Sequence, residues 1–256
     1  MKSFDPAKTK NTIIKFIRNY INDSGFSKLV VGLSGGLDSA TCAYLASKAV
    51  GKENVYLFNL PYKISSPESR EDAQLVADAL GIELDVYDIT PAVDALMRKR
   101  SSPDKLRLGN VCARMRMIVL YDFASELNAL VVATSNKSES YLGYTTLWGD
   151  MAGAFAPIGD IFKTQEFEFA EYLGVPEKVI QKPPTADLWE DQTDEDELGL
   201  SYEQADNILH NIVDLGHSPE NVEAMGFSRE NIDRVMNLYI RNKFKSHMPH
   251  YPQIKT

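Results

Sequence analysis

Residues 28–50 read KLVVGLSGGLDSATCAYLASKAV: a short apolar run, a turn with two glycines, and a longer apolar run. The first run, 28–33, is bounded by turn residues, which predicts a strand buried on both faces. The second run has the composition of a buried helix over 40–50, and Gly51 predicts its C-terminal cap. A strand and a helix joined by so short a turn predict the first unit of a parallel sheet covered by helices.

The same alternation of strand and helix continues along the chain. Further strands are predicted at 55–60, 83–89 and 130–133. Helices are predicted at 8–22, 67–80, from 91 onward, and at 110–128, 164–173, 201–215 and 228–244. The pattern predicts an α/β fold, a doubly wound, mostly parallel sheet with helices on both faces and extra C-terminal helices. We expect a single domain over 1–256, with the core sheet in about 28–165 and a C-terminal loop and helices in about 166–256.

Composition narrows the class of protein further. The chain has 256 residues, 44% of them hydrophobic, and a net charge of −9. So acidic a chain is a poor candidate for binding nucleic acid or an anionic membrane, and no apolar run approaches the ~20 residues that span a bilayer. The two cysteines lack CxxC spacing, which favours buried thiols in a reducing compartment. We therefore expect a cytoplasmic protein without a nucleic-acid or membrane partner.

The turn at 32–39, GLSGGLDS, is the most informative segment for function. It lies at the carboxyl end of a predicted strand and the start of a helix, where open α/β sheets bind ligands. Gly35 and Gly36 permit a sharp turn that aims backbone N–H groups at an anion, and Asp38 offers a carboxylate to Mg²⁺. The chain contains neither G-x-x-x-x-G-K-[ST] nor G-x-G-x-x-G, so the two better-known phosphate loops are excluded.

This turn resembles the pyrophosphate loop of the ATP-pyrophosphatase group, which adenylates carboxylates or carbonyls and releases pyrophosphate. Within that group, the chain resembles the ammonia-dependent NAD⁺ synthetases. The similar blocks, in order, are GLSGGLDSA (32–40), GNVCARMRM (109–117), ATSNKSE (133–139), YLGYTTLWGD (141–150), FKTQ (162–165) and PPTADLWEDQTDEDELGLSY (183–202). The resemblance implies an ATP-pyrophosphatase-like fold, a homodimer and a ligase that requires Mg²⁺. That ligase would amidate the nicotinate carboxylate of deamido-NAD⁺ through an acyl-adenylate, using ATP and ammonia and releasing AMP and pyrophosphate.

The resemblance also implies roles for individual residues. Positions matching the ATP site of the family are Gly32, Leu33, Ser34, Gly35, Gly36, Leu37, Asp38, Ser39, Thr134, Lys163 and Thr185. Asp38 and Lys163 would be the catalytic residues, with Asp38 and Glu139 as the metal ligands and Lys163 balancing the charge of the departing pyrophosphate. Arg114 and Lys245 match positions that bind deamido-NAD⁺. Arg116 is predicted on another face of the same helix, so Arg114 is the preferred ligand.

The chain departs from a common family pattern, F-T-K-[YF]-G-D-G-G-x-D. Leu147 stands at the position of the lysine and Ala154 at that of the last aspartate, so these two roles are not transferred. Trp148 or Tyr144 offers a ring for stacking instead. Phe244 stands where the family has the histidine of a His-Lys pair, which leaves only the lysine of that pair.

Three alternatives stay open at this stage. Another enzyme of the group, a tRNA thiolase or a GMP synthetase-like protein, would share the glycine turn. A thiolase needs a reactive cysteine and a basic surface, neither of which is evident. A non-catalytic nucleotide-binding protein of the same architecture needs no carboxylate pair for Mg²⁺, so Asp38 and Glu139 argue against it. We expect free ammonia as the nitrogen donor because no glutaminase-like segment is present, and we expect the acidic run at 190–197 to be a solvated loop.

Overall fold

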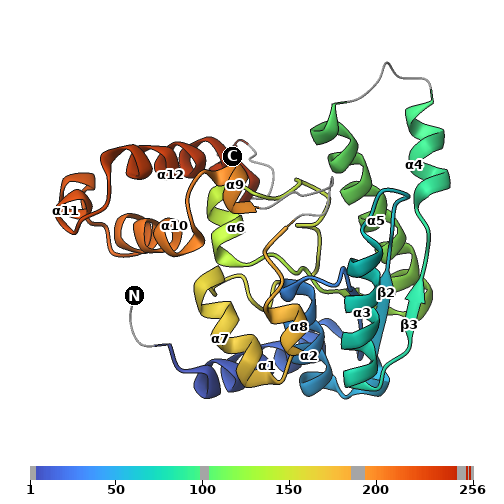
Figure 1. Cartoon of the computed structure of the whole chain (residues 1–256). Coiled ribbons are helices and arrows are strands. Elements are labelled where there is room, and N and C mark those ends of the chain that lie inside the picture. Colours follow the sequence, from blue (N-terminus) through green and yellow to red (C-terminus); the bar gives the residue numbers. More distant parts are fainter. Residues whose placement is uncertain (1–3, 99–103, 186–193, 247–251, 253, 255–256) are drawn as a thin grey trace.

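The computed structural model describes residues 4–98, 104–185, 194–246, 252 and 254. Its centre is a parallel sheet of four strands in the order β3-β2-β1-β4 (Figure 1). The strands are β1 (Lys28–Gly32), β2 (Val55–Asn59), β3 (Leu84–Val86) and β4 (Ala129–Val131). Because β1 lies between β2 and β4, the turn that follows β1 emerges in the middle of the carboxyl edge of the sheet.

Side chains of β1 alternate between the two faces of the sheet. Leu29 and Val31 are fully buried on one face and Val30 on the other. The first face is covered by α1 (Pro6–Ser24), α2 (Leu37–Val50), α3 (Pro67–Leu80) and α7 (Lys163–Leu173). The second face is covered by α4 (Thr90–Met97) and α5 (Lys105–Leu127). The prediction of a parallel sheet with helices on both faces is therefore confirmed.

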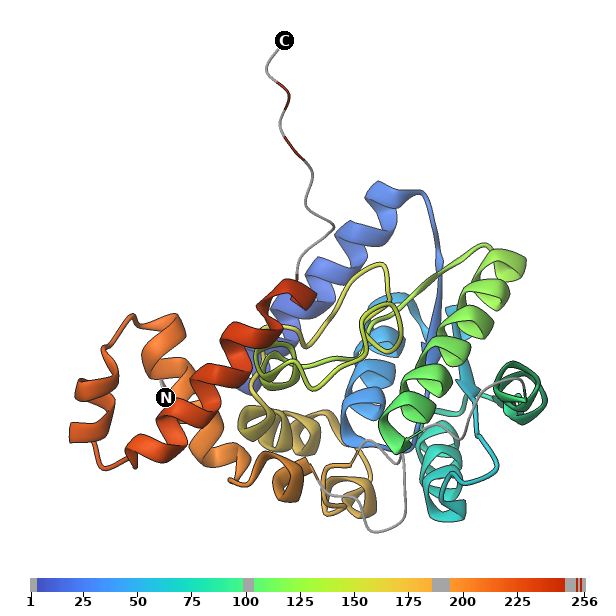
Figure 2. The same cartoon turned by 90° about the horizontal axis from the view of Figure 1, so that it is seen from above.

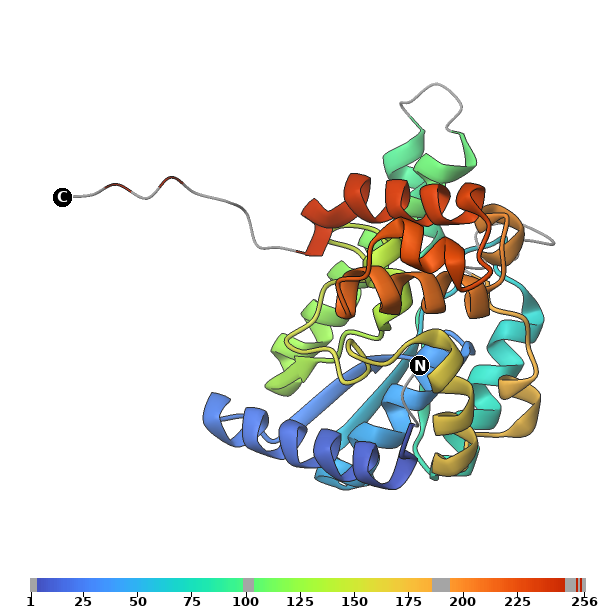
Figure 3. The ribbon, with the colours of Figure 1, turned by 90° about the vertical axis from the view of Figure 1, so that its left-hand side faces the viewer.

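The C-terminal helices form a hydrophobic cluster of their own. They are α10 (Tyr202–Leu209), a π-helical turn (His210–Asp214), α11 (Pro219–Ala224) and α12 (Arg229–Asn242). Leu142 of α6 (Lys137–Leu142) and Phe162, which precedes α7, join the same cluster. Figures 2 and 3 show this group at one side of the molecule, in contact with α6 and α7. Within the described part of the chain, no helix combines the length and apolarity needed to cross a bilayer.

Several predicted boundaries differ from the observed ones. Helix α5 begins at Lys105 because Asp104 caps it, accepting a hydrogen bond from the backbone N–H of Arg107 at 2.7 Å. Strand β3 is shorter than predicted. Two short helices, α8 (Glu177–Ile180) and α9 (Asp194–Leu198), stand where a loop or no element was expected. The acidic run at 190–197, predicted as a solvated loop, is helical from Asp194 onward, and Asp194 is buried, whereas Glu195, Asp196 and Glu197 are exposed as predicted; 190–193 lie outside the described residues.

Gly35 is the residue on which the turn after β1 depends. Its φ is +89°, in the left-handed region that favours glycine. A Cβ atom at this position would lie 2.0 Å from the carbonyl oxygen of Ser69 in α3, because the turn packs directly against that helix. Gly36, in contrast, has a φ of −88° and is the N-cap of α2.

We expect Gly35→Ala to lower the free energy of unfolding by roughly 2–4 kcal/mol, because strain at a positive φ adds to a clash with backbone. Gly216→Ala is the matched control, since Gly216 has a φ of +71° but no atom within 4 Å of the added Cβ. Urea unfolding of both variants measures the difference. Equal losses of stability would show that the packing against Ser69 contributes nothing.

Candidate active site

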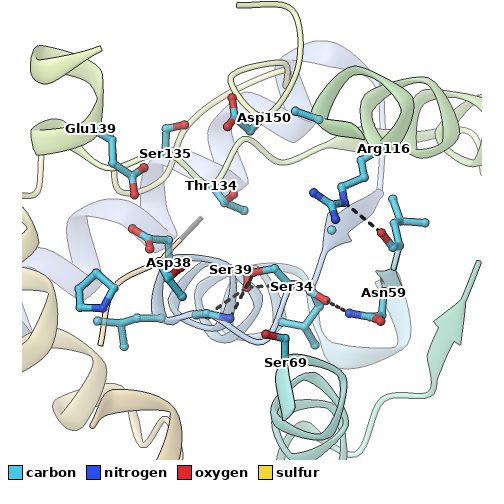
Figure 4. A pocket seen from close by; sticks show the side chains of 18 of the residues that line it. Ser34, Asp38, Ser39, Asn59, Ser69, Arg116, Thr134, Ser135, Glu139 and Asp150 are labelled. Carbon is cyan, nitrogen blue, oxygen red and sulfur yellow. Dashed lines mark hydrogen bonds between the residues drawn. The ribbon is translucent and has the colours of Figure 1, made fainter. Parts of the chain in front are cut away.

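A cavity of about 280 Å³ opens at the carboxyl edge of the sheet (Figure 4). The turn after β1 forms part of its lining, together with residues that follow β2 and β4 and residues of α3 and α5. Most positions predicted from the resemblance lie on its wall: Gly32, Leu33, Ser34, Gly36, Leu37, Asp38, Ser39, Thr134, Glu139, Lys163 and Thr185. Residues from distant parts of the sequence are thus brought to one place.

The turn is braced by its own serines. The Ser34 backbone N–H donates to Ser39 Oγ at 3.2 Å, and the Ser39 hydroxyl donates to the Gly36 carbonyl at 3.0 Å. The Gly36 N–H donates to Ser34 Oγ at 3.2 Å. No described side chain caps the start of α2, so the first N–H groups of this helix remain available to an anion. The turn therefore presents backbone donors of the kind that a phosphate group would accept.

Lys163 and Asp38 form a buried ion pair beside this turn. Lys163 Nζ lies 2.5 Å from Asp38 Oδ2 and 3.5 Å from Glu166 Oε2, and the Lys163 side chain is only 2% exposed. Burial raises the pKa of Asp38, but the charge of Lys163 and hydrogen bonds outweigh it, so the pKa lies below its usual range. Burial lowers the pKa of Lys163, and the charges of Asp38 and Glu166 more than reverse this. Both partners are therefore ionised at neutral pH.

The start of α6 places a second carboxylate in the cavity. Asn136 and Glu139 form a capping box, in which Asn136 Oδ1 accepts from the Glu139 N–H at 2.9 Å and Glu139 Oε2 accepts from the Asn136 N–H at 3.3 Å. The Asn136 amide also donates to Asp38 Oδ1 at 2.6 Å. Figure 4 shows Asp38 and Glu139 pointing toward one another. Burial and the charge of Asp38 raise the pKa of Glu139 well above its usual value.

This pair of carboxylates suits a divalent cation that also binds phosphate oxygens. Mg²⁺ is usually held by one or two carboxylates, substrate phosphates and water. In the described part of the chain there is no cluster of three or more metal-ligating side chains, as an all-protein metal cage would need. A cation between Asp38 and Glu139 would relieve the repulsion that raises the Glu139 pKa. The residues present therefore fit Mg²⁺ bound together with a triphosphate.

The C-terminal helices hold Lys163 in place. Asp206 of α10 is fully buried and accepts from the Thr164 N–H at 3.0 Å, which satisfies one of the first donors of α7. Its other oxygen accepts from the Ser138 hydroxyl, whose oxygen accepts in turn from the Lys163 N–H at 2.8 Å. The backbone of Lys163 is thus fixed by α6 and α10 together.

Thr185 reaches the cavity from the segment that leads toward α9. The preceding Lys182 also lines the cavity, and its Nζ lies 3.1 Å from Ser69 Oγ and 3.0 Å from Asp72 Oδ2. Asp72 is fully buried and also pairs with Lys178 at 2.8 Å. This ion network fixes the start of the segment to α3, next to the turn after β1.

Three of the predicted residues do not line the cavity: Gly35, which packs against α3, Arg114 and Lys245. Arg114 is exposed, and its Nε donates to the Leu147 carbonyl at 3.2 Å. The Nζ of Lys245 donates to the carbonyls of Gly143 and Thr145, at 2.7 and 3.0 Å. Arg116, which the helical spacing had set aside, does line the cavity. The roles of Arg114 and Lys245 stay predictions.

Sequence reasoning missed several residues of the cavity wall. These are Asn59, Arg116, Asp150, Lys182 and Asp194. Asn136 was part of a recognised block without a role, although Asn three residues before Glu is a capping-box signal. The others carry no local signal, because only the packing of distant segments turns them toward the cavity.

We expect Glu139→Gln to stabilise the ligand-free protein at neutral pH by on the order of 1 kcal/mol. The folded protein holds the Glu139 proton to a higher pH than the unfolded chain does, so wild-type stability falls as the pH rises above about 4.3. The amide removes this loss and keeps the capping box. Urea unfolding at pH 7 and pH 4 measures the gain, which should vanish at pH 4. Exposed Glu126→Gln is the control, and an equal gain there at pH 7 would contradict the account.

Comparison with known proteins places the chain in a family. The profile of a family described as NAD synthase matches residues 9–249. The NH(3)-dependent NAD(+) synthetase of Fusobacterium nucleatum subsp. nucleatum is 44% identical over 245 residues, covering 96% of this chain and 95% of that protein.

Two solved structures are similar along their whole length. One is the NMN synthetase from Francisella tularensis, with a TM-score of 0.87 and 31% identity over 98% of this chain and 100% of that one. The other is the NH3-dependent NAD synthetase from Campylobacter jejuni in complex with the nitrate ion, with a TM-score of 0.83 and 32% identity at the same coverage. Because the family profile and a 44% identical relative both span nearly the whole sequence, this chain belongs to the NAD synthase family.

Proposed function

We propose that this protein is an ammonia-dependent NAD⁺ synthetase. It amidates the nicotinate carboxylate of deamido-NAD⁺ with ATP and ammonia, and it releases AMP and pyrophosphate. The observation that carries the proposal is the buried Asp38–Lys163 pair beside an uncapped, serine-braced turn, opposite the carboxylate of Glu139. A carboxylate is a poor electrophile, so it must be activated before ammonia can displace an oxygen from it.

The first step joins the nicotinate carboxylate to the α-phosphorus of ATP and expels pyrophosphate. It needs no protein nucleophile, so the contribution of the chain is positioning and charge neutralisation. The turn after β1 and the N-terminus of α2 bind the triphosphate through backbone N–H groups. Lys163 moves its charge from Asp38 toward the departing pyrophosphate. Thr134 and Thr185, which both line the cavity, contact ATP.

Asp38 and Glu139 hold Mg²⁺ in this proposal. When bound, the ion neutralises phosphate charge and aligns the phosphate oxygens. Asn136 orients both carboxylates, since it donates to Asp38 and caps the helix that carries Glu139. Lys163 fixes the remaining oxygen of Asp38 before the ion arrives.

Arg114 and Lys245 bind deamido-NAD⁺ outside the cavity. Both lie beside the 143–150 segment, whose carbonyls they hold, and a dinucleotide is long enough to extend from the cavity to this segment. Trp148 has a φ of 58°, an uncommon value for a bulky residue, and it is 49% exposed. Backbone strain at an exposed aromatic residue is typical of a functional position, and the indole ring of Trp148 is suited to stack on the substrate.

The assay that tests the function incubates the protein with Mg-ATP, ammonium and deamido-NAD⁺. Equal amounts of AMP and NAD⁺ support the proposal, and an unchanged dinucleotide in a folded sample contradicts it. Because one structural relative is described as an NMN synthetase, nicotinate mononucleotide is offered in a parallel assay. Faster amidation of the mononucleotide would support the same adenylation and amidation reaction but would make the mononucleotide, and not deamido-NAD⁺, the substrate.

We expect Asp38→Asn to lower turnover by at least about 10³-fold, because a metal ligand and the partner of Lys163 are lost together. The matched control is Asp85→Asn, an exposed residue of the edge strand β3, which should retain wild-type activity. Titration with Mg²⁺ gives a second readout, since Asp38→Asn should require more of the ion to shift the melting temperature in the presence of ATP. Wild-type turnover by the Asp38 variant would overturn the assignment.

A homodimer is part of the proposed function. Phe16 of α1 and both Ile118 and Tyr121 of α5 are large apolar side chains with exposures of 45%, 54% and 43%. Tyr20 packs against Phe16, with ring centroids 5.9 Å apart, and together with burial it raises the pKa of Tyr121. Exposed apolar side chains on both α1 and α5 are expected of a patch that a second copy covers.

Ile118→Asp should convert the protein to a monomer, because it places a charge in this patch. Light scattering coupled to gel filtration measures the mass. The control, Ile240→Asp, changes an isoleucine of α12 that is 67% exposed and should leave the mass unchanged. A dimer that survives Ile118→Asp would exclude this face.

The cytoplasm is the proposed location. Cys42 and Cys112 are both buried and free, and burial raises the pKa of both thiols. Thiols of this kind are typical of proteins in a reducing compartment.

A further inference from the structure

Asp194, the first residue of α9, lies in the wall of the cavity. It is 3% exposed, and its Oδ2 accepts a hydrogen bond from the Tyr202 hydroxyl at 3.0 Å. Its backbone N–H donates to the Pro184 carbonyl at 3.0 Å. Among the residues that the structure describes, no donor lies within hydrogen-bond distance of the buried Oδ1. One oxygen is therefore held by the fold, while the other is buried without a donor.

The other carboxylates in the described wall of the cavity already have partners. Asp38 is paired with Lys163, and both Glu139 and Asp150 accept backbone N–H groups. A buried carboxylate oxygen without a donor is unfavourable in the empty protein, and a ligand that supplies a donor removes this penalty. Asp194 thus differs from these three neighbours in having a buried oxygen that no described donor reaches.

The charges around Asp194 connect it to the reacting end of the cavity. Burial raises its pKa, the hydrogen bond from Tyr202 and the charge of Lys163 oppose this, and the charge of Asp38 adds to it. Asp194 therefore lies within electrostatic reach of the two residues that hold the triphosphate in the proposed function.

We propose that Asp194 binds the ammonium ion that provides the amide nitrogen. The inference rests on the proposed function, which requires ammonia as the second nucleophile. Ammonium presents N–H donors and needs acceptors, and Asp194 Oδ1 is an acceptor without a partner. Mg²⁺ demands several oxygens in near-octahedral geometry, which a single open oxygen does not offer.

One proton passes from ammonium to Asp194 Oδ1, and the freed nitrogen lone pair attacks the carbonyl carbon of the acyl-adenylate. The new C–N bond forms, the bond between the carbonyl carbon and the AMP oxygen breaks, and AMP leaves with that electron pair. The adduct loses a second N–H proton to water, which leaves the neutral carboxamide. No oxidant, reductant or further reactant is needed.

The test separates adenylation from amidation in Asp194→Asn. Without ammonium, exchange of labelled pyrophosphate into ATP reports adenylation alone. We expect this exchange and the KM for ATP to stay within about twofold of wild type, while the KM for ammonium chloride rises roughly tenfold or more, as for loss of a hydrogen bond to a charged group. Hydroxylamine, which is largely unprotonated at neutral pH, should partly restore product formation as the hydroxamate.

Asp196→Asn is the matched control, because Asp196 lies on the same short helix but is exposed. It should leave the KM for ammonium unchanged. If Asp194→Asn fails to fold, Asp194→Glu replaces it, because glutamate keeps the charge but displaces it. This variant should also retain pyrophosphate exchange and show a smaller increase in the KM for ammonium.

Three outcomes would overturn the inference. An unchanged KM for ammonium in the folded variant would show that Asp194 does not bind the ion. Loss of pyrophosphate exchange that excess Mg²⁺ restores would make Asp194 a metal ligand instead. If the variant shows normal pyrophosphate exchange but forms no product with either hydroxylamine or ammonium, the role of Asp194 is not to accept the proton of ammonium. Failure of the proposed function is distinguishable, because then the wild type shows no pyrophosphate exchange that depends on deamido-NAD⁺.

Discussion

The contact between Lys163 and Asp38 is the interaction on which the site depends. It joins the first turn of α2 to the first residue of α7, two helix N-termini that both point positive ends at the cavity. Burying a lysine is unfavourable unless its charge is paired, and here Asp38 and Glu166 pair it. The cavity thus keeps a cation in place beside a surplus of carboxylates, an arrangement that is completed by a metal ion and a polyanion.

The rest of the chain serves to maintain this contact. Asp206 in the C-terminal part caps α7 and, through Ser138, fixes the backbone of Lys163. On the opposite side, Gly35 allows the turn after β1 to approach α3 so closely that no side chain fits between them. The C-terminal helices therefore support the site, although none of their described residues lines the cavity.

How much the sequence predicts depends on whether the signal is local. The β1–turn–α2 unit has a buried apolar run and two glycines in adjacent positions, so its strand is predicted to within one residue, although α2 begins at Leu37, three residues before the predicted start at 40. The start of α5 was misplaced because Gly109 resembles a boundary, whereas Asp104 is the actual cap. Asp194 was assigned to a solvated loop since its acidic neighbours dominate the local pattern, and only packing against Tyr202 buries it. Arg116 was set aside on helical spacing alone, which does not determine what stands opposite each face.

The central claim is that this cavity makes a carboxylate reactive by joining it to the α-phosphate of ATP. The most direct measurement uses deamido-NAD⁺ labelled with oxygen-18 in the nicotinate carboxylate, followed by mass spectrometry of the AMP after turnover with ammonium. The account predicts that each AMP carries one oxygen-18 atom, because the carboxylate oxygen that attacks phosphorus leaves with it. AMP without the label, formed together with amidated product, would contradict an acyl-adenylate and with it the role assigned to the Asp38–Lys163 pair.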